Sequence, residues 1–325
     1  MKDKFVHHPI QQLTRLVLMM GLLVGFVSLS TQASQASTTT PAANSVIKAI
    51  AAAPTLTSLP PNLTPPLTDF ANAAEADALS GVASFSACSA YNNTTEQNNP
   101  TPCIMGDVQS SKVIVIVGDS YVGNWVPALN KGLSAAGYRL DVFGFPGCPT
   151  ADIRYTGLGD NESTACNTWH AKVPGVISAL HPVAVIVTSG YDMPNVSDKT
   201  WVDGFDTLFT KSTAGSPSAK RILMGISPFF TEPVPDCLAG HSNPRDCSIS
   251  DRSGIYRDYL EVDPIIATAS KAKLIPTYQW FCHKQTCSAV ISHFVVFADS
   301  DHLTIAYSDY ISTLVTSAVL NALTT

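Results

Sequence analysis

An uninterrupted β-branched run at residues 113–117 (VIVIV) constrains the fold of this chain more than any other feature. A strand that is apolar on both faces has to be covered on both faces, as the strands of parallel sheets are. Residues 183–187 (VAVIV) repeat this pattern. Between the two runs, Trp125, Ala128 and Leu129 follow the spacing of an amphipathic helix. The sequence therefore indicates strands and helices that alternate around a buried sheet.

The same alternation continues to the end of the chain. Further strands are expected at 140–143, 221–226 and 273–275. Helices are expected at 122–136, 167–180, 201–211, 253–270 and 304–323. Alternating β and α units of this length predict an α/β fold with a mostly parallel sheet covered on both faces.

The composition agrees with a folded protein that does not bind nucleic acid. Of 325 residues, 45% are hydrophobic and 14% are charged, which supports one sizeable core and excludes wholesale disorder. The formal charge of −6 disfavours contact with phosphate backbones. Dinucleotide-binding, phosphate-loop and H-E-x-x-H motifs are missing from the sequence, and no cofactor or metal is expected.

The first 36 residues have the organisation of a secretory signal. Lys2, Lys4 and Arg15 precede an apolar stretch at 16–29, and small residues follow at 31–36. We expect cleavage near residue 33 or 36 and a secreted or extracytoplasmic protein of the cell envelope. The alternative is an uncleaved N-terminal membrane anchor, although the apolar stretch is shorter than the roughly 20 residues of a spanning helix.

Residues 37–80 are rich in Ala, Thr, Ser and Pro. This composition predicts a linker or loosely attached arm in front of one domain at 81–325. The spacing of Leu56, Leu59 and Leu63 indicates that part of the arm packs on that domain. We expect the rest of the arm to be mobile.

The eight cysteines, an even number, fit an oxidising compartment. They fall into four couples that are close in sequence, and a disulfide is expected within each couple. The couples are Cys88–Cys103, Cys148–Cys166, Cys237–Cys247 and Cys282–Cys287. The alternative for the last couple is a zinc site that includes His283, but the chain has no C-x-x-C pair.

A serine turn follows the first strand. Gly118, Asp119 and Ser120 stand where a doubly wound sheet presents its ligands, at the carboxyl end of a parallel strand. There the Ser120 hydroxyl would lie at a helix N-terminus, whose N–H groups stabilise developing negative charge. The alternative is that Asp119 or Ser120 serves as a helix N-cap.

A second cluster, near the C-terminus, supplies the groups that a serine nucleophile requires. Such a serine needs a base, and the base needs a carboxylate that fixes its tautomer. Asp299 and His302, three residues apart, can meet side chain to side chain. Asp301 is the competing acid, but an adjacent residue generally points away from the histidine, so Asp299 is preferred. His170, on an expected helix, is interpreted as a surface residue.

These residues resemble the SGNH (GDSL-type) hydrolase superfamily. More narrowly, the chain resembles the extracytoplasmic SGNH domain of bacterial acyltransferase-3 membrane proteins. Beyond the serine and histidine blocks, the resemblance rests on residues 63–67 (LTPPL), 102–107 (PCIMGD), 147–149 (GCP) and 166–169 (CNTW).

The resemblance implies a three-layer α/β/α, doubly wound fold of the SGNH or flavodoxin-like type. It implies a serine esterase or O-acyltransferase that acts on acyl groups, commonly acetyl, of cell-envelope carbohydrate. Ser120 would be the nucleophile, His302 the base and Asp299 its orienting acid. The backbone N–H groups of Ser120 and Gly147 would help to form the oxyanion hole. A separate membrane acyltransferase is the protein partner that the resemblance suggests.

Two positions depart from the family pattern. Tyr121 stands where the acyltransferase-linked domains usually have His, and residues 189–192 lack the usual oxyanion asparagine. Asn124 or Tyr191 is the candidate for the missing donor. The departures leave open the alternative of a catalytically weak or inactive module that binds a glycan or a partner.

Two further expectations concern His302 and the last disulfide. His302 must be neutral to accept the serine proton, so activity is expected to fall as the pH drops through about 6.5. The Cys282–Cys287 bridge precedes Asp299 in sequence and is expected to hold that segment near Ser120.

Overall fold

The computed structural model describes residues 43–91, 93–156, 160–190, 196–252 and 254–324. The expected signal at 1–36 lies outside these residues. Among the helices that are described, none combines the length and the apolar character needed to cross a bilayer.

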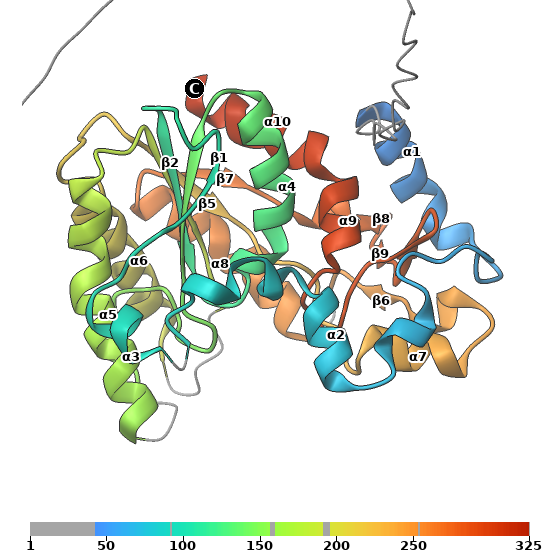
Figure 1. Cartoon of the computed structure of the whole chain (residues 1–325). Helices are drawn as coiled ribbons and strands as arrows, with labels where there is room; N and C mark the ends of the chain where they lie inside the picture. The colour runs from blue at the N-terminus through green and yellow to red at the C-terminus, as the bar shows by residue number, and fades with distance from the viewer. Residues whose placement is uncertain (1–42, 92, 157–159, 191–195, 253, 325) are drawn as a thin grey trace, which may run out of the picture. The chain divides into compact units, whose positions relative to one another are not determined.

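A six-stranded sheet forms the centre of the described chain, in the order β1-β3-β2-β4-β5-β7 (Figure 1). The strands are β1 (Cys103–Gly106), β2 (Val113–Gly118), β3 (Arg139–Gly144), β4 (Ala184–Thr188), β5 (Lys220–Met224) and β7 (Lys273–Ile275). β1 pairs with β3 in antiparallel orientation, and the other neighbours are parallel. The predicted α/β fold with a mostly parallel sheet is confirmed. The short edge strand β1 was not predicted.

The order of the parallel strands reverses between β2 and β4. The chain passes from β2 to β3 on one side of β2 and then crosses to β4 on the other side. In doubly wound sheets a crevice opens at the carboxyl ends of the strands that flank such a reversal. Ser120 comes directly after β2, so the topology places it at this crevice.

Strand β2 shows why residues 113–117 are all apolar. Ile114 and Ile116 are buried in the core on one face of the sheet. Val113, Val115 and Val117 are buried in the core on the other face. Because successive side chains of a strand point to opposite faces and both faces are covered, neither set can be polar.

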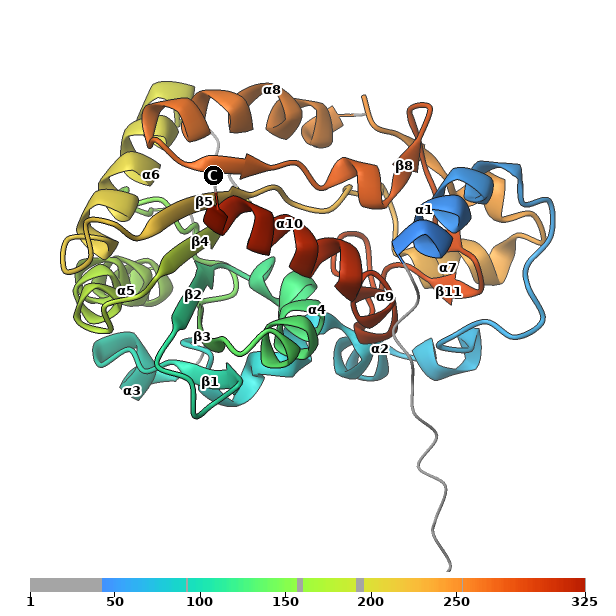
Figure 2. The same ribbon diagram turned by 90° about the horizontal axis from the view of Figure 1, so that it is seen from above.

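Two layers of helices provide this cover (Figure 2). One face carries α4 (Val122–Ala135), α9 (Ile305–Tyr310) and α10 (Ser312–Thr324). The other face carries α5 (Asp160–Ala179), α6 (Asp198–Ser212) and α8 (Gly254–Ala269). The fold is therefore the three-layer α/β/α sandwich that the resemblance implies. The single helix expected at 304–323 is instead two helices, which are separated at Ile311.

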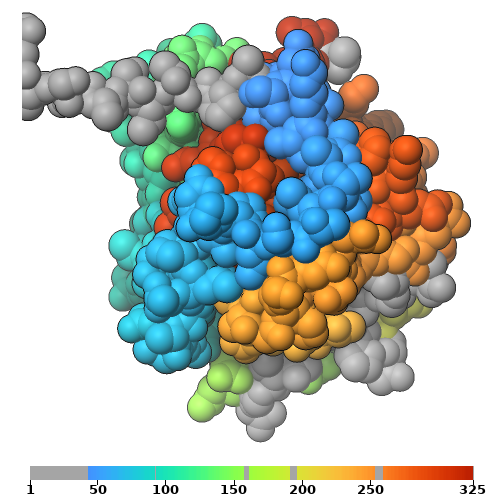
Figure 3. All heavy atoms as spheres, turned by 90° about the vertical axis from the view of Figure 1, so that its right-hand side faces the viewer, coloured from blue at the N-terminus to red at the C-terminus, as the bar shows by residue number. Residues whose placement is uncertain are grey.

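The segment in front of the sheet differs from the loosely attached arm that its composition predicts. Up to residue 80 it contains α1 (Ala43–Ala52), η1 (Ala53–Thr55), η2 (Leu67–Phe70) and α2 (Ala73–Leu79). The elements η3 (Gly81–Cys88) and α3 (Thr94–Asn98) follow, in the part that was expected to belong to the domain. Val46, Ile50 and Phe70 are buried in the same core as α4. Figure 3 shows α1 and the residues after it, in blue, lying across residues of the last third of the chain, in orange and red. For this segment, the regular spacing of apolar residues therefore predicts packing better than the Ala- and Pro-rich composition does.

Two glycines let this segment approach α4 closely. A Cβ on Gly81 would lie 2.1 Å from the Gly123 carbonyl oxygen, and a Cβ on Gly123 would lie 2.5 Å from the Val82 nitrogen. The Gly81 N–H also donates to the Leu303 carbonyl at 2.8 Å. η3 is therefore fixed both to the helix that follows Ser120 and to the residue that follows His302.

Short elements and disulfides complete the described chain. The elements are α7 (Val234–Gly240), η4 (Pro244–Cys247), β6 (Ile249–Ser250), η5 (Tyr278–Trp280), β8 (Cys282–His283), β9 (Thr286–Cys287), β10 (Val290–Ile291) and β11 (Phe294–Val295). The disulfides are Cys88–Cys103, Cys148–Cys166, Cys237–Cys247 and Cys282–Cys287, the couples expected from the sequence. The last one joins β8 to β9, so this pair has no thiolate to offer to the zinc site considered as its alternative.

Candidate active site

Strand β2 ends in the sharp turn that carries Ser120. A Cβ on Gly118 would lie 2.2 Å from the Thr188 carbonyl oxygen, so a glycine is needed where the end of β2 meets β4. The Asp119 carboxylate accepts the Tyr121 N–H at 2.9 Å and closes the turn. α4 begins two residues after Ser120, which puts Ser120 at the positive end of the helix dipole.

Ser120, His302 and Asp299 form a continuous hydrogen-bonded chain. The His302 Nε2 atom lies 2.7 Å from Ser120 Oγ, and its Nδ1 atom lies 2.7 Å from Asp299 Oδ2. The other Asp299 oxygen accepts the backbone N–H groups of Asp301 and His302, at 2.8 and 2.7 Å. The fold thus brings together the three residues that the sequence suggests as nucleophile, base and acid, in the order that a serine triad requires.

Asp301 does not point away from His302, as the sequence reasoning assumed. Its Oδ1 atom lies 3.7 Å from His302 Nδ1. The Tyr121 side chain, next to Ser120, forms a hydrogen bond with the Asp301 carboxylate. The tight turn from 299 to 302 directs both carboxylates to the same side of the imidazole. Asp301 is therefore a second acidic neighbour of the ring.

The electrostatics of this cluster favour a protonated imidazole. Burial opposes a charge on His302, but the hydrogen bond to Asp299 and the negative charges of Asp301, Asp299 and Asp119 outweigh it and raise the pKa of His302 to about 9. Burial acts to raise the pKa of Asp299, yet the hydrogen bond from His302 and the charge of that ring lower it overall. Asp299 therefore stays ionised while His302 takes up a proton.

Asn124 has a different position from the one expected of an oxyanion donor. Its amide is fully buried, and Nδ2 donates to Ser227 Oγ at 2.9 Å and to the Asp301 carbonyl at 3.2 Å. Its Oδ1 atom accepts the Leu303 N–H at 2.8 Å. Both amide hydrogens are used within the protein, so the assignment of Asn124 to the oxyanion hole is wrong. Its contacts instead hold the turn that carries His302.

Asp119 links the serine turn to the end of β4. Its Oδ2 atom accepts the Ser189 hydroxyl at 2.9 Å and the Gly190 N–H at 2.7 Å, and the Ser189 hydroxyl oxygen in turn accepts the Thr150 N–H at 2.9 Å. Burial raises the pKa of Asp119 to about 7, although these hydrogen bonds and that from Tyr121 oppose the shift. The sequence offered Asp119 as a helix cap, and this wider role was missed.

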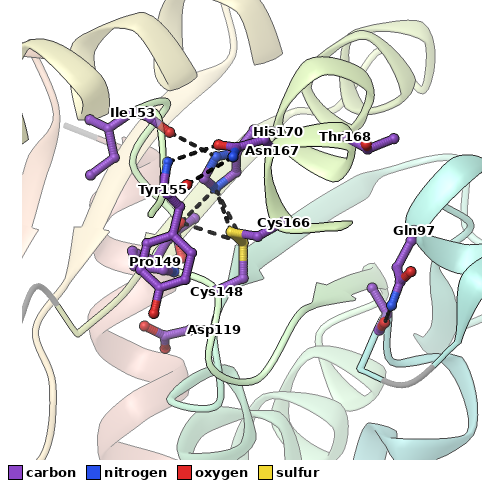
Figure 4. Close-up of a disulfide and its surroundings, with 12 residues drawn as sticks. Gln97, Asp119, Cys148, Pro149, Ile153, Tyr155, Cys166, Asn167, Thr168 and His170 are labelled. Atoms are coloured by element: carbon purple, nitrogen blue, oxygen red, sulfur yellow. Dashed lines mark hydrogen bonds between the residues drawn. A yellow bond between two sulfur atoms is a disulfide. The ribbon is translucent and has the colours of Figure 1, made fainter. Parts of the chain in front are cut away.

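The loop that follows Gly147 is fastened to α5 through Cys148 and Tyr155, which Figure 4 shows beside Cys166 and Asn167. Cys148 is bonded to Cys166 on α5. Farther along the loop, the Tyr155 N–H and carbonyl both bond the Asn167 amide, at 2.8 and 2.9 Å. The left-handed backbone of Gly147, with φ of +77°, favours glycine at this bend.

His170 also holds this loop to α5. It is buried, so its interpretation as a surface residue is wrong. Its ring is 4% exposed, with Nε2 2.6 Å from the Pro149 carbonyl and Nδ1 3.2 Å from the Ile153 carbonyl. Burial lowers the pKa of this imidazole. The helix expected at 167–180 begins earlier, at Asp160, and turns His170 toward the loop. The motif at 166–169 contributed to the family resemblance, but it gave no sign that the next residue, His170, holds the loop.

Two N–H groups beside Ser120 are available to a substrate oxygen. Within the described residues, neither the Ser120 N–H nor the Gly147 N–H has a hydrogen-bond acceptor. Gly147 and Ser120 line one hollow of about 190 Å³, together with Gly190. Tyr191, the remaining candidate donor, lies outside the described residues.

A second hollow is also lined by Ser120. It has a volume of about 480 Å³ and is lined by Ser120, His302 and Asp299 together with residues of α2 and η3, among them Asp77 and Val82. The end of the segment that was expected to be a loose arm therefore contributes to the wall of the site, through Asp77, Ala78 and Ser80.

Comparison with known proteins places this site in a family. The family model described as "SGNH domain (fused to AT3 domains)" matches residues 87–317, which include Ser120 and His302. The chain belongs to this family. The resemblance stated from the sequence is therefore confirmed. No curated protein matches the SGNH chain.

One solved structure shares the fold of this chain. The periplasmic domain of a lipopolysaccharide acetyltransferase from Salmonella ser. Paratyphi A is similar with a TM-score of 0.59 at 15% identity, covering 78% of this chain and 99% of that one. A carbohydrate esterase family 2 enzyme with its carbohydrate-binding domain, from Corynascus thermopiles (Myceliophthora fergusii), has a TM-score of 0.36 at 13% identity, covering 64% of this chain and 66% of that one.

Proposed function

We propose that this chain is an exported serine esterase or O-acyltransferase that acts on acyl esters, in particular acetyl esters, of cell-envelope carbohydrate. The observation that carries the proposal is the pair of 2.7 Å contacts that link Ser120 Oγ to His302 Nε2 and His302 Nδ1 to Asp299. Membership of the SGNH family supports a hydrolase or acyltransferase module. The lipopolysaccharide acetyltransferase domain and the carbohydrate esterase among the similar structures suggest the substrate class.

The geometry supports a double-displacement reaction. Ser120 Oγ attacks the ester carbonyl carbon and its proton passes to His302 Nε2. The carbonyl oxygen becomes negative and is stabilised by the N–H groups of Ser120 and Gly147. The bond to the alcohol oxygen then breaks as His302 returns the proton to that oxygen, which leaves an acyl-serine. Water or a sugar hydroxyl attacks the acyl-serine by the same steps in reverse, giving hydrolysis or transfer.

The extracytoplasmic setting rests on the disulfides and on the first 36 residues. Four disulfides require an oxidising compartment, and the basic and apolar pattern before residue 37 is that of an export signal. We expect the exported chain to begin near Ser34 or Ser37. Intact-mass measurement tests this, because a mass that still includes residues 1–33 would indicate a membrane anchor.

A partner follows from the same family description. The family consists of SGNH domains that are fused to AT3 domains. We therefore propose a membrane acyltransferase as the source of acyl groups if the reaction is transfer. Incubating the purified chain with an acetylated sugar and a second, unacetylated sugar, then analysing the products, separates hydrolysis from transfer.

The central experiment is active-site labelling. A fluorophosphonate reacts with serines that a neighbouring base activates, and mass spectrometry of the digested protein should find it on Ser120. Ser120→Ala should abolish labelling, whereas Ser134→Ala, which changes an exposed serine on α4, the helix that follows Ser120, should leave it intact. A folded protein that stays unlabelled would contradict the proposal and favour a glycan-binding or partner-binding module instead.

A further inference from the structure

Two hollows meet at Ser120, and they have different chemistry. The larger hollow, of about 480 Å³, includes His302 and Asp299 in its lining but not Gly147. The smaller hollow, of about 190 Å³, includes Gly147 but neither His302 nor Asp299. Ser120 is common to both. An ester bound at Ser120 can therefore place one part in each hollow.

The proton path decides which part of the ester enters which hollow. His302 has to reach the alcohol oxygen, because it returns the proton that lets the alcohol leave. The carbonyl oxygen has to reach the N–H groups of Ser120 and Gly147. The alcohol portion therefore lies in the larger hollow, on the His302 side. The carbonyl oxygen and the acyl group attached to the same carbon lie toward the smaller hollow.

The wall of the larger hollow has the surfaces that a sugar ring requires. Tyr91 is 56% exposed at this wall, and its ring can cover the apolar C–H face of a pyranose. Asp77 lines the same wall and offers a carboxylate to the hydroxyls at the ring edge, whereas the Ser86 hydroxyl donates to the Ala83 carbonyl and the Ser89 hydroxyl accepts the Tyr91 N–H. A mixture of apolar surface and a few polar groups is typical of small-molecule sites.

Aromatic side chains line the smaller hollow. Tyr155 and Tyr259 are 7% and 3% exposed, and Phe229 completes the aromatic lining. In Figure 4 the Tyr155 ring extends from the loop toward Asp119, which lines the same hollow. Tyr155 cannot withdraw easily, because its backbone is bonded on both sides to Asn167. The hollow's volume of about 190 Å³ has room for a short acyl group.

We propose that the larger hollow binds the sugar that carries the ester, with Tyr91 as the surface on which the ring stacks, and that the smaller hollow limits the acyl group to a short chain. This inference rests on the proposed function, since it assigns the two sides of the same reaction centre. It makes Tyr91 a determinant of alcohol specificity and Phe229 and Tyr155 determinants of acyl specificity.

The alcohol side is tested with two acetate esters on the full exported chain. One is a mono-O-acetylated methyl hexoside, and the other is ethyl acetate, whose alcohol is too small to reach Tyr91. Tyr91→Ala should lower the ratio of kcat/KM for the sugar ester to that for ethyl acetate about tenfold, and Tyr91→Trp should retain it. Tyr278→Ala, which changes an exposed tyrosine outside both hollows, is the matched control. An unchanged ratio in Tyr91→Ala overturns the assignment.

A binding measurement separates failure of this inference from failure of the proposed function. In a Ser120→Ala background, calorimetric titration with the acetylated hexoside should give a Kd that rises about tenfold when Tyr91→Ala is added. Loss of this difference overturns the role of Tyr91, even if fluorophosphonate labels Ser120 in the parent chain. A Tyr91-dependent Kd without any labelling of Ser120 would retain the sugar site and overturn the esterase reaction.

The acyl side is tested with ethyl esters of increasing chain length. Phe229→Ala, at a partly exposed position, should raise kcat/KM for ethyl hexanoate relative to ethyl acetate at least about fivefold. Tyr155→Ala should act in the same direction. If both folded variants keep the parent preference, or if the parent already hydrolyses hexanoate as well as acetate, the smaller hollow does not set the acyl length.

Discussion

The carboxylate of Asp301 lies 3.7 Å from Nδ1 of His302, the same ring nitrogen that Asp299 holds at 2.7 Å. The imidazole therefore has two acidic neighbours on one side and Ser120 on the other. Each carboxylate favours the charged ring, and together with Asp119 they raise the pKa of His302 to about 9 despite burial. The proton affinity of the proposed base is thus set by three residues and not by the triad acid alone.

The first prediction concerns the pH dependence of activity. Only neutral His302 can accept the Ser120 proton, so a pKa of about 9 means that kcat/KM rises with pH, reaches half of its maximum near pH 9 and levels off only above that pH. This replaces the midpoint of about 6.5 expected from an unperturbed histidine. Asp301→Asn removes one of the charges that raise the pKa, so the rising limb should move to lower pH. Initial rates with ethyl acetate from pH 5 to 10 measure the rising limb of the parent and that of Asp301→Asn.

This prediction has a matched control variant. Asp309→Asn changes a carboxylate on α9 that is not among the groups acting on His302, and its profile should coincide with that of the parent. A parent midpoint near 6.5 that Asp301→Asn does not move would contradict the influence of Asp301 on the ring.

The second prediction concerns the dependence of the reaction on Ser120 and His302 as a unit. Each single alanine variant should lose about three orders of magnitude or more in kcat, and the double variant should be little worse. The reason is that neither residue can act when the other is absent. Asp299→Asn should cost less than either, because Ser120 and His302 remain in contact. Fully additive losses in a double-mutant cycle would argue against proton transfer between them.

The third prediction concerns Asn124. Asn124→Ala removes three buried hydrogen bonds and leaves the Leu303 N–H without its acceptor. Its free energy of unfolding should fall by about 3 kcal/mol, and kcat should fall as well, because the turn that carries His302 loses its support. Urea denaturation and ester hydrolysis measure the two effects. Asn98→Ala, at an exposed position, is the control and should change neither.

The fourth prediction compares two disulfides. Replacing Cys148 and Cys166 with serine opens a loop of 18 residues beside Gly147, so it should lower stability by about 3 kcal/mol and reduce kcat. Replacing Cys282 and Cys287 opens a hairpin of 5 residues between β8 and β9 and should affect stability more than kcat. The opposite order of effects on kcat would restore the expectation that the Cys282–Cys287 bridge matters most to the site.

The fifth prediction concerns the contact between η3 and α4. Gly81→Ala places a methyl group against the Gly123 backbone, so η3 must shift, and we expect a loss of about 2 kcal/mol or more in stability. Hydrolysis of the acetylated hexoside should fall too, because η3 lines the larger hollow. Gly175→Ala meets no atom within 4 Å and should be neutral or slightly stabilising.

The alternation of strands and helices and the candidate residues Ser120, Asp299 and His302 could be proposed from the sequence because they depend on local pattern. Residues 113–117 require cover on both faces whatever their partners are, and Ser120 follows that strand directly in sequence. Asp299 and His302 are close enough in sequence to meet in one turn. The cysteine couples are also local, so the expected pairings coincide with the observed disulfides.

Features that depend on residues far apart in the sequence became evident only in the tertiary structure. Asn124 supports the His302 turn across 179 residues of sequence, and a polar residue in an amphipathic helix gives no sign of such a partner. The Ala- and Pro-rich segment before residue 80 folds because the core offers surface to Val46 and Phe70. The proton affinity of His302 follows from the burial and position of Asp119, Asp299 and Asp301. Local spacing fixes which groups can meet in one turn, whereas desolvation and through-space charge act only after the chain has folded.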